Sequence, residues 1–490
     1  MEIKFEVVLL FFLVHFCSSV AQEARLTPAI KKQINTYIQA EMKAEQIPGL
    51  TYAVVSNEKI IDSGAYGLAN VELNAPVTSH SLFSIGSIGK TFTATAIMLL
   101  QKDGKLSIDD PIDKYLDSIP DSWKEIKIKN LLSHTSGIKD YAHDFPGYPF
   151  IEKDRKQEIT EAQFIRMATN LPLNFQPGER WAYSNSNFVL LGFIIHKVSG
   201  KPLPAFMKER IFDPLNMKET RYTSVTEIIP NRAHGYLLDE DDNNKLINGI
   251  YVSNFFSTMG DMGIITTATD LAKWSIAQDE GKILDKQTLQ QMWTPSRLNN
   301  GLEAMGILGI NYGLGWAISD HRGTLEIGHG GSFINGYTAT LSRFPEKRLN
   351  VVVLANLNPT NVDWIGYTIA GFFSKSLQGI DQIKTQKNAD TSFNENMRTF
   401  LKSLGSGNYD RSFVTDSYIN RTNPITKVVF ASSANFNLSF TASDKMPEHF
   451  ERYGVAVEKI NYYQVTFRNE THYLAVYLTA DSKIADVRGY

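Results

Sequence analysis

The sequence predicts an α+β protein in which an antiparallel sheet, flanked by helices and carrying a helical insertion, precedes a small C-terminal α+β domain. The first indication is that β-like runs occur near both ends of residues 22–378, with a mostly helical, loop-rich stretch between them. Strands that flank helices in this order typically form one sheet around an insertion. The second indication is a polar, unpatterned stretch at 379–392, which we interpret as a linker to a separate domain at 393–490.

Residues 1–21 have the pattern of a secretory signal peptide. A lysine precedes the apolar run 7–16, and small residues at Ser19 and Ala21 suit cleavage after Ala21. The run is too short to span a bilayer comfortably. We therefore expect a secreted or periplasmic protein with no integral membrane segment after cleavage. The alternatives are a short buried helix and a membrane or lipid anchor, but Phe16 stands where a lipoprotein signal needs a small residue.

Composition excludes several function classes. The formal net charge is −3 and no dense basic cluster occurs, so we expect no nucleic-acid partner. Cys17 is the one cysteine, which excludes a thiol nucleophile and a cysteine-based zinc site. The histidines are scattered and no His-Glu-x-x-His pattern occurs, so we expect neither a metal nor another cofactor.

Local patterns predict the elements of the first domain. Thr27-Pro28 is typical of an N-cap followed by proline at the first helical position, and isoleucines at 30, 34 and 38 give that helix an apolar face. A second helix covers 91–102, with apolar residues at helical spacing and a stop at Gly104. Apolar runs predict strands at 50–55, 59–62, 323–327, 337–343 and 350–354, and a last helix covers 362–377.

The C-terminal domain begins with a predicted helix over 393–404. It continues as β-like runs at 425–430, 435–440, 462–467, 473–478 and 484–487. This order looks like a ketosteroid-isomerase-type cone, with a small barrel or sandwich as the alternative. We find no catalytic constellation in this domain, so we expect it to bind a ligand or to pack against the first domain.

The tetrad Ser87-Ile88-Gly89-Lys90 opens the helix over 91–102 and is the main indication of function. Residues three apart share a helix face, so the Lys90 ammonium can reach the Ser87 hydroxyl, which becomes a good nucleophile when a neighbour takes its proton. The helix N-terminus adds N–H groups where an oxyanion would form. The alternative is an ordinary N-terminal serine with an exposed lysine. A second match, Ser56-Asn57-Glu58-Lys59, is interpreted as a hairpin because it joins two strand-like runs.

Three further segments can be combined with this tetrad. In Tyr183-Ser184-Asn185, the phenol is a candidate general base beside an ammonium, and the Asn185 amide can bind a substrate amide or hold Lys90. In His329-Gly330-Gly331-Ser332, the glycines allow another backbone to approach closely, and a strand edge can offer an N–H group to a substrate carbonyl. The alternatives are a core tyrosine and a glycine bulge with a surface histidine. For His134, within Leu131 to Gly137, we favour a structural hydrogen-bonding role in a turn over a catalytic one.

In this order the motifs resemble those of the serine β-lactamase and penicillin-binding-protein family, in particular its class C β-lactamase-related branch of esterases and DD-peptidases. The resemblance covers roughly residues 30–377 and includes the supporting phrases Gly104-Lys105-Leu106, Leu131 to Gly137, Pro214 to Met217 and Thr266 to Leu271. It implies a β-lactamase/DD-peptidase-like fold with Ser87 as nucleophile and with Lys90 and Tyr183 as the proton-transfer pair. It further implies an oxyanion hole from the Ser87 and Ser332 N–H groups, and Asn185 as a ligand of the substrate amide.

The resemblance implies an exported serine hydrolase that forms an acyl-enzyme on Ser87 and hydrolyses an ester or peptide bond of a small-molecule or peptide substrate. His329 stands where class C β-lactamases usually have lysine, and a neutral histidine holds a substrate carboxylate less well. One alternative is a β-lactamase or a D-Ala-D-Ala carboxypeptidase. Another is a catalytically silent binding protein on the same fold.

Overall fold

The computed structural model describes residues 24–145, 160–249, 259–305, 310–333, 335–383, 385–386, 391–404, 410–421, 436–446, 450–452, 454–467 and 470–489. The predicted signal peptide and the predicted strand 425–430 lie outside these residues. Among the helices of the described ranges, none combines the length and the apolar character needed to cross a membrane.

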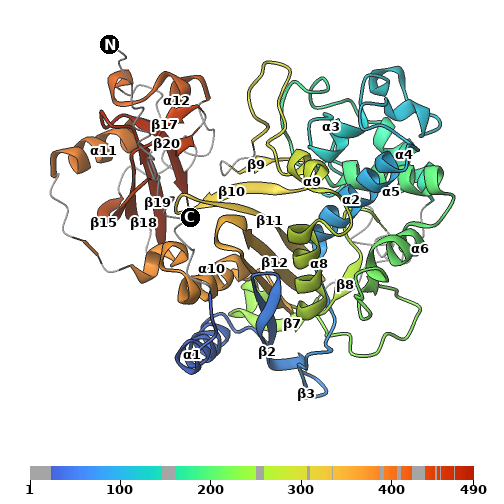
Figure 1. Cartoon of the computed structure of the whole chain (residues 1–490), viewed down its shortest axis with the longest axis horizontal. Coiled ribbons are helices and arrows are strands. Elements are labelled where there is room, and N and C mark those ends of the chain that lie inside the picture. Colours follow the sequence, from blue (N-terminus) through green and yellow to red (C-terminus); the bar gives the residue numbers. More distant parts are fainter. Residues whose placement is uncertain are drawn as a thin grey trace, which may run out of the picture.

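The first domain is built on the predicted antiparallel sheet, with strand order β3-β2-β1-β13-β12-β11-β10-β9 (Figure 1). Strands from the two ends of the domain meet where β1 pairs with β13. Ser56 pairs with Lys59 across the β1–β2 hairpin, so the second Ser-x-x-Lys match is a hairpin, as predicted. The strands are β1 Gly49–Ser56, β2 Lys59–Asn70, β3 Ala75–Pro76, β9 Asn311–Tyr312, β10 Ala317–His321, β11 Thr324–Phe333, β12 Tyr337–Phe344 and β13 Leu349–Ala355.

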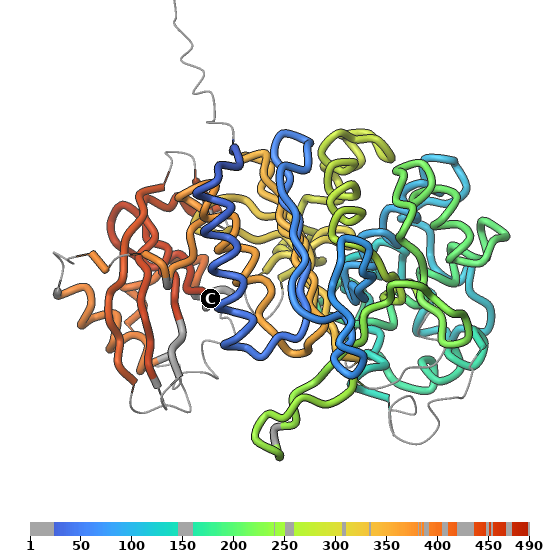
Figure 2. Tube along the Cα trace, turned by 90° about the horizontal axis from the view of Figure 1, so that it is seen from below, coloured from blue at the N-terminus to red at the C-terminus, as the bar shows by residue number. Residues whose placement is uncertain are grey.

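Alternating side chains of the central strands enter two different cores. Val54 and Val353 pack with the apolar face of α1 (Pro28–Ala44) and with α10 (Val362–Phe373), which lie along one face of the sheet (Figure 2). Val55 and Val352 enter the larger core on the opposite face. Because both faces are covered, these strands are continuous apolar runs, which made them easy to predict.

Helices and two small sheets build the insertion and the edges of the first domain. The helices are α2 Gly89–Lys102, α3 Ile128–Leu132, α4 Glu161–Thr169, α5 Asn185–Ser199, α6 Leu203–Met207, α8 Ala268–Glu280 and α9 Lys286–Met292. The small strands are β4 Phe83–Ser84, β5 Arg221–Tyr222, β6 Tyr236–Asp239, β7 Lys245–Asn248, β8 Ile264–Thr266 and β14 Leu357–Asn358. They pair in the orders β4-β8-β5 and β14-β6-β7, while a third pair belongs to the C-terminal domain.

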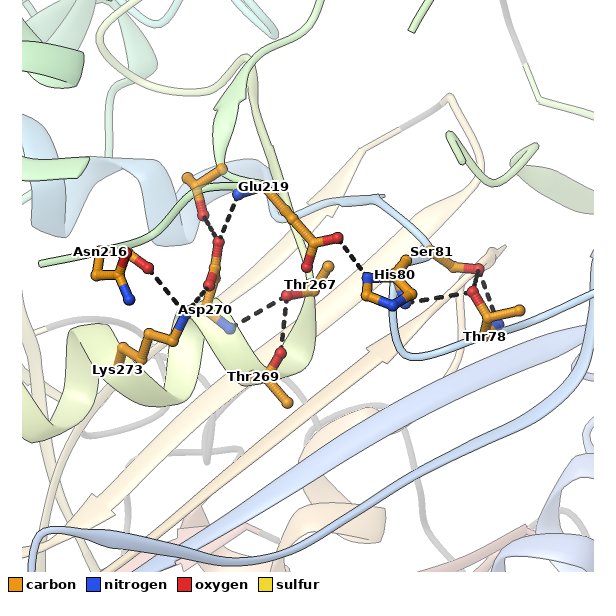
Figure 3. A network of polar contacts seen from close by, with 10 residues as sticks. Thr78, His80, Ser81, Asn216, Glu219, Thr267, Thr269, Asp270 and Lys273 are labelled. Atoms are coloured by element: carbon orange, nitrogen blue, oxygen red, sulfur yellow. Dashed lines mark hydrogen bonds and ion pairs between the residues drawn. The ribbon is translucent and has the colours of Figure 1, made fainter. Parts of the chain in front are cut away.

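A polar network fixes the segment that leads into Ser87 (Figure 3). The His80 ring, just before β4, bonds to the Glu219 carboxylate at 2.6 Å. The Glu219 backbone N–H donates to Asp270, whose own N–H donates to the Thr267 hydroxyl at the N-cap of α8. The predicted phrase Thr266 to Leu271 therefore ties α8 to the chain that carries the tetrad.

The C-terminal domain is a four-stranded antiparallel sheet with helices on one face. The elements are α11 Thr391–Leu404, α12 Asp416–Arg421, β15 Asn437–Lys445, β16 Glu451–Arg452, β17 Val455–Ala456, β18 Lys459–Phe467, β19 Glu470–Leu478 and β20 Ile484–Gly489. The sheet order is β15-β18-β19-β20, and Met397 and Leu401 of α11 pack on it. The cone proposed from the sequence stays a prediction.

The C-terminal sheet packs against the β10–β11 hairpin of the first domain (Figure 1). The buried carboxylate of Asp320 accepts hydrogen bonds from Arg488 at 3.2 Å and from the Tyr477 hydroxyl at 2.7 Å. Arg322 at the hairpin turn forms an ion pair with Asp444 at 2.6 Å. The stretch predicted as a linker contributes Ile380, which is fully buried in an apolar cluster with Tyr462 and Tyr477 of the C-terminal sheet, so this stretch is packed rather than only polar.

Candidate active site

Ser87 lies in a 3₁₀ turn, Gly86–Ile88, that continues directly into α2. The turn begins at Gly86 with φ of +47°, a conformation that glycine adopts at little cost. Ser87 is half-buried, whereas Ile88 and the following turn of α2 are buried in the large core. The predicted start of the helix is therefore present, and the Ser87 side chain at that start remains partly exposed.

Lys90 is fully buried and is the centre of the polar contacts around Ser87. Its ammonium donates to the Ser87 hydroxyl at 2.9 Å, to the Asn185 amide oxygen at 2.8 Å and to the Asp261 backbone carbonyl at 3.2 Å. Three acceptors match the three hydrogens of an ammonium group. The alternative of an exposed lysine is therefore wrong.

Tyr183 lies beside this ammonium, just before α5. The Lys90 nitrogen is 5.0 Å from the centre of the Tyr183 ring, close enough for a cation–π contact. Tyr183 is half-buried and packs against the His134 ring, with 4.3 Å between ring centres and 34° between the ring planes. The structure thus brings the first two predicted motifs together.

His134 lies beneath Tyr183 and is fully buried. Its Nδ1 accepts from the Ser184 backbone N–H at 3.2 Å, and burial together with the nearby Lys90 charge holds the pKa of the ring well below its usual value. The neutral ring therefore carries its proton on Nε2. These contacts agree with the structural role expected from the sequence.

The glycines of the third motif let β11 press against the turn that carries Ser87. A Cβ at position 331 would lie 1.9 Å from the Ile85 carbonyl oxygen and 3.2 Å from the Ser87 nitrogen. A Cβ at position 86 would lie 3.0 Å from the Ser332 nitrogen. The Gly86–Ser87 and Gly331–Ser332 backbones therefore lie close together, as an oxyanion hole that takes one N–H group from each segment would need.

His329 has both ring nitrogens engaged within the protein. Its Nδ1 donates to the Gly330 carbonyl at 2.6 Å, and its Nε2 accepts from the Tyr312 hydroxyl at 2.9 Å. Burial and the Lys90 charge lower the pKa of His329 to about 4, so the ring is neutral at pH 7. The alternative of a glycine bulge with a surface histidine is wrong for the histidine, because this side chain is buried.

Sequence reasoning missed several side chains around Lys90. Asp140 bonds to Asn185, and the buried Asp261 carboxylate accepts from the Tyr141 hydroxyl at 2.8 Å. Burial raises the pKa of Asp261 to about 6. Tyr312 belongs to a glycine-rich aromatic stretch, Asn311 to Trp316, which was the one local signal among them. The two aspartates reach the site only through tertiary contacts.

The side chains around Ser87 are of the types used in acid–base catalysis at a serine. Within the described ranges, no group of three or more His, Cys, Asp or Glu side chains is placed to hold a metal ion. A hydroxyl, an ammonium and a phenol lie together, with two close backbone segments beside them. When the lysine and the tyrosine together hold one proton fewer than an ammonium plus a phenol, they can accept the proton of a serine, and neighbouring backbone N–H groups can stabilise the oxyanion that its attack creates.

Comparisons with known proteins agree with this geometry. The family model described as Beta-lactamase matches residues 34–370. Penicillin-binding protein 4* of Bacillus subtilis (strain 168) is 30% identical over 338 residues, which cover 66% of this chain and 72% of that protein. A D-aminopeptidase of Brucella anthropi is 25% identical over 63% of this chain and 56% of its own length.

Among solved structures, the octameric penicillin-binding protein homologue from Pyrococcus abyssi has the same fold, with a TM-score of 0.59 and 24% identity. The match covers 91% of this chain and 90% of that one, so it extends beyond the family model into the C-terminal region. The α+β fold class predicted from the sequence is confirmed, and the chain is a serine hydrolase of the β-lactamase and penicillin-binding-protein family.

Proposed function

We propose that this protein hydrolyses an ester or amide bond through an acyl-enzyme on Ser87. The observation that carries the proposal is the buried ammonium of Lys90, which donates to the Ser87 hydroxyl at 2.9 Å and lies 5.0 Å from the Tyr183 ring. A binding protein on the same fold would not need a buried ammonium aimed at a serine. This contact therefore favours catalysis over the silent alternative.

The reaction proceeds in two halves. In the reactive form the Lys90–Tyr183 pair holds one proton fewer than an ammonium plus a phenol. It therefore accepts the Ser87 proton while the Ser87 oxygen attacks the substrate carbonyl carbon, and the oxyanion accepts from the Ser87 and Ser332 N–H groups. The bond to the leaving group breaks as Tyr183 returns the proton to it. Water then attacks the acyl carbon, gives a proton to the same pair, and the bond to the Ser87 oxygen breaks with that oxygen reprotonated.

The preferred substrate carries no free carboxylate on its leaving group. His329 is neutral, and its two nitrogens are used by Gly330 and Tyr312, so it offers no cation to a carboxylate. This disfavours the alternatives of an efficient β-lactamase and of a D-Ala-D-Ala carboxypeptidase. Amides and esters of D-residues without a terminal charge fit the site and the name of the related D-aminopeptidase. Export through residues 1–21 to the periplasm or the exterior is part of the proposal.

A serine-directed fluorophosphonate probe tests the acyl-serine mechanism. We expect one covalent adduct per chain, located on the peptide that contains Ser87 when the labelled protein is digested and analysed by mass spectrometry. Ser56, in the other Ser-x-x-Lys match, is the internal control and should remain unlabelled, because it is buried in β1. A protein that stays unmodified at Ser87 would support the silent binding protein instead.

A matched pair of peptides tests the proposed substrate class. We expect an N-acyl-D-Ala-D-Ala peptide with a C-terminal amide to be cleaved with a kcat/KM at least equal to that of the same peptide with a free carboxylate. A fixed cation in the site would favour the acid roughly tenfold or more, because hydrogen bonds to charged groups are stronger than neutral ones. A tenfold or larger preference for the peptide with the free carboxylate would instead support the D-Ala-D-Ala carboxypeptidase alternative.

A further inference from the structure

The Asn185 side chain connects Lys90 to a second charged group, Asp140. Its amide oxygen accepts from Lys90 at 2.8 Å, and its amide nitrogen donates to the Asp140 carboxylate at 3.2 Å. An ammonium can only donate and a carboxylate can only accept, so one orientation of the amide satisfies both neighbours. In the opposite orientation the amide nitrogen would face the Lys90 ammonium, which is also a donor, and the amide oxygen would face the Asp140 carboxylate, which is also an acceptor.

Asp140 is built into the fold in a way that suits this task. It follows α3 in a loop, and only 5% of its surface is exposed. One carboxylate oxygen accepts from the backbone N–H groups of Asn185 at 3.0 Å and Ala142 at 3.2 Å. The other oxygen also contacts the exposed His143 ring at 2.9 Å. The next residue of the loop, Tyr141, donates to the carboxylate of Asp261, whose backbone carbonyl accepts from Lys90.

A purely structural role for Asp140 is the competing explanation. Asn185 is the first residue of α5, and the N-cap residue Ser184 makes no side-chain capping bond. A carboxylate that accepts the Asn185 backbone N–H stabilises this helix terminus. That role would involve the backbone alone, whereas the bond from the Asn185 amide nitrogen connects Asp140 to the Ser87–Lys90 pair.

We propose that Asp140 is a positioning residue of this active site, which acts through Asn185. It fixes the amide so that the oxygen holds the Lys90 ammonium toward Ser87. The amide nitrogen has two hydrogens, and Asp140 takes one, which leaves the second for a substrate carbonyl. The inference rests on the proposed function and adds a residue to it.

A double-mutant cycle separates the two explanations. We expect Asp140→Asn to lower kcat/KM roughly tenfold to a hundredfold, because the Asn185 amide can then rotate and misplace Lys90. In an Asn185→Ala background the same substitution should change kcat/KM by less than about twofold, since the coupling partner is gone. A capping role would instead lower the melting temperature equally in both backgrounds and leave kcat/KM little changed in either, which would overturn the inference.

Asp144→Asn is the matched control. Asp144 lies in the same loop and accepts from the Asp140 backbone N–H at 2.9 Å, but its carboxylate makes no contact with Asn185 among the described residues. We expect this variant to keep kcat/KM within about twofold of the wild type. Asp140→Glu keeps the carboxylate and should recover part of the activity that Asp140→Asn loses. If Asp144→Asn lowers kcat/KM as much as Asp140→Asn, the effect belongs to the loop and the inference fails.

The labelling rate at Ser87 keeps this test independent of the proposed function. If the wild-type protein does not react with the fluorophosphonate, the proposed function fails whatever Asp140 does. If the wild type reacts and Asp140→Asn reacts equally fast with unchanged ester kinetics, the positioning role alone fails.

Discussion

Replacing Ser87 by alanine is expected to lower kcat for an aryl ester by about four orders of magnitude or more, because removal of a serine nucleophile leaves only binding and oxyanion stabilisation. Folding should be little affected, since Ser87 is half-buried and Lys90 keeps its bonds to Asn185 and to the Asp261 carbonyl. Initial rates with p-nitrophenyl butyrate, together with thermal unfolding, measure both quantities.

Two variants make this prediction specific. Ser56→Ala removes the serine of the other Ser-x-x-Lys match, which lies in the β1–β2 hairpin, and should leave the rate unchanged. Residues that act as a unit lose activity non-additively, so Ser87→Ala combined with Lys90→Met should be no slower than Ser87→Ala alone. A Ser87→Ala enzyme that keeps more than about a hundredth of the wild-type kcat would contradict the acyl-serine mechanism.

Most of the successful predictions came from local sequence patterns, in which the residues concerned lie close together in the chain. The central strands are apolar throughout because both faces of the sheet are covered, and the opening of α2 has helical spacing behind its serine. Where a strand lies at a solvent edge the pattern weakens. Only two of the twelve residues of β2 are buried, so just its first residues, 59–62, were predicted as strand. The short β10 was missed for a different reason, because two of its buried residues, Asp320 and His321, are polar.

Contacts between distant parts of the chain could not be predicted from local patterns. Lys90 and Asp261 are 171 positions apart, and Asn185 and Asp140 are 45 apart. Nothing near either aspartate in the sequence distinguishes it from a surface acid; burial against Lys90 does so only after folding. His329 was predicted as a substrate ligand from its place in a motif, and only its bonds to Tyr312 and Gly330 show how its nitrogens are used.

The C-terminal domain illustrates a further limit of sequence patterns. Its helix and most of its strands were predicted, but its contact with the first domain includes a buried ion pair between Asp320 and Arg488, 168 positions apart. That pair anchors the β10–β11 hairpin, and β11 carries the motif His329 to Ser332. The C-terminal domain therefore contacts the hairpin whose second strand carries this motif.

Replacing Gly331 by alanine should lower kcat about a hundredfold or more, because the added Cβ would lie 1.9 Å from the Ile85 carbonyl and 3.2 Å from the Ser87 nitrogen. Both of these are backbone atoms, so no flexible side chain can move aside. Either β11 or the Ser87 turn must shift, and this shift would separate the N–H groups of Ser87 and Ser332 that we propose as the oxyanion hole. The strain should also lower the stability by about 1–3 kcal/mol. Steady-state kinetics and thermal unfolding of the purified variant measure these two losses.

Gly330→Ala is the matched steric control for this change. It adds the same methyl group one position earlier on the same strand, where the new Cβ would meet only the Asp363 carboxylate at 3.9 Å, an ordinary contact. We expect a melting temperature close to that of the wild type and a much smaller loss of kcat than in Gly331→Ala. The two variants differ in contact with the Ser87 turn and not in strand propensity, since alanine replaces glycine in both. Equal losses in the two variants would therefore show that the close approach of β11 to Ser87 is not what supports catalysis.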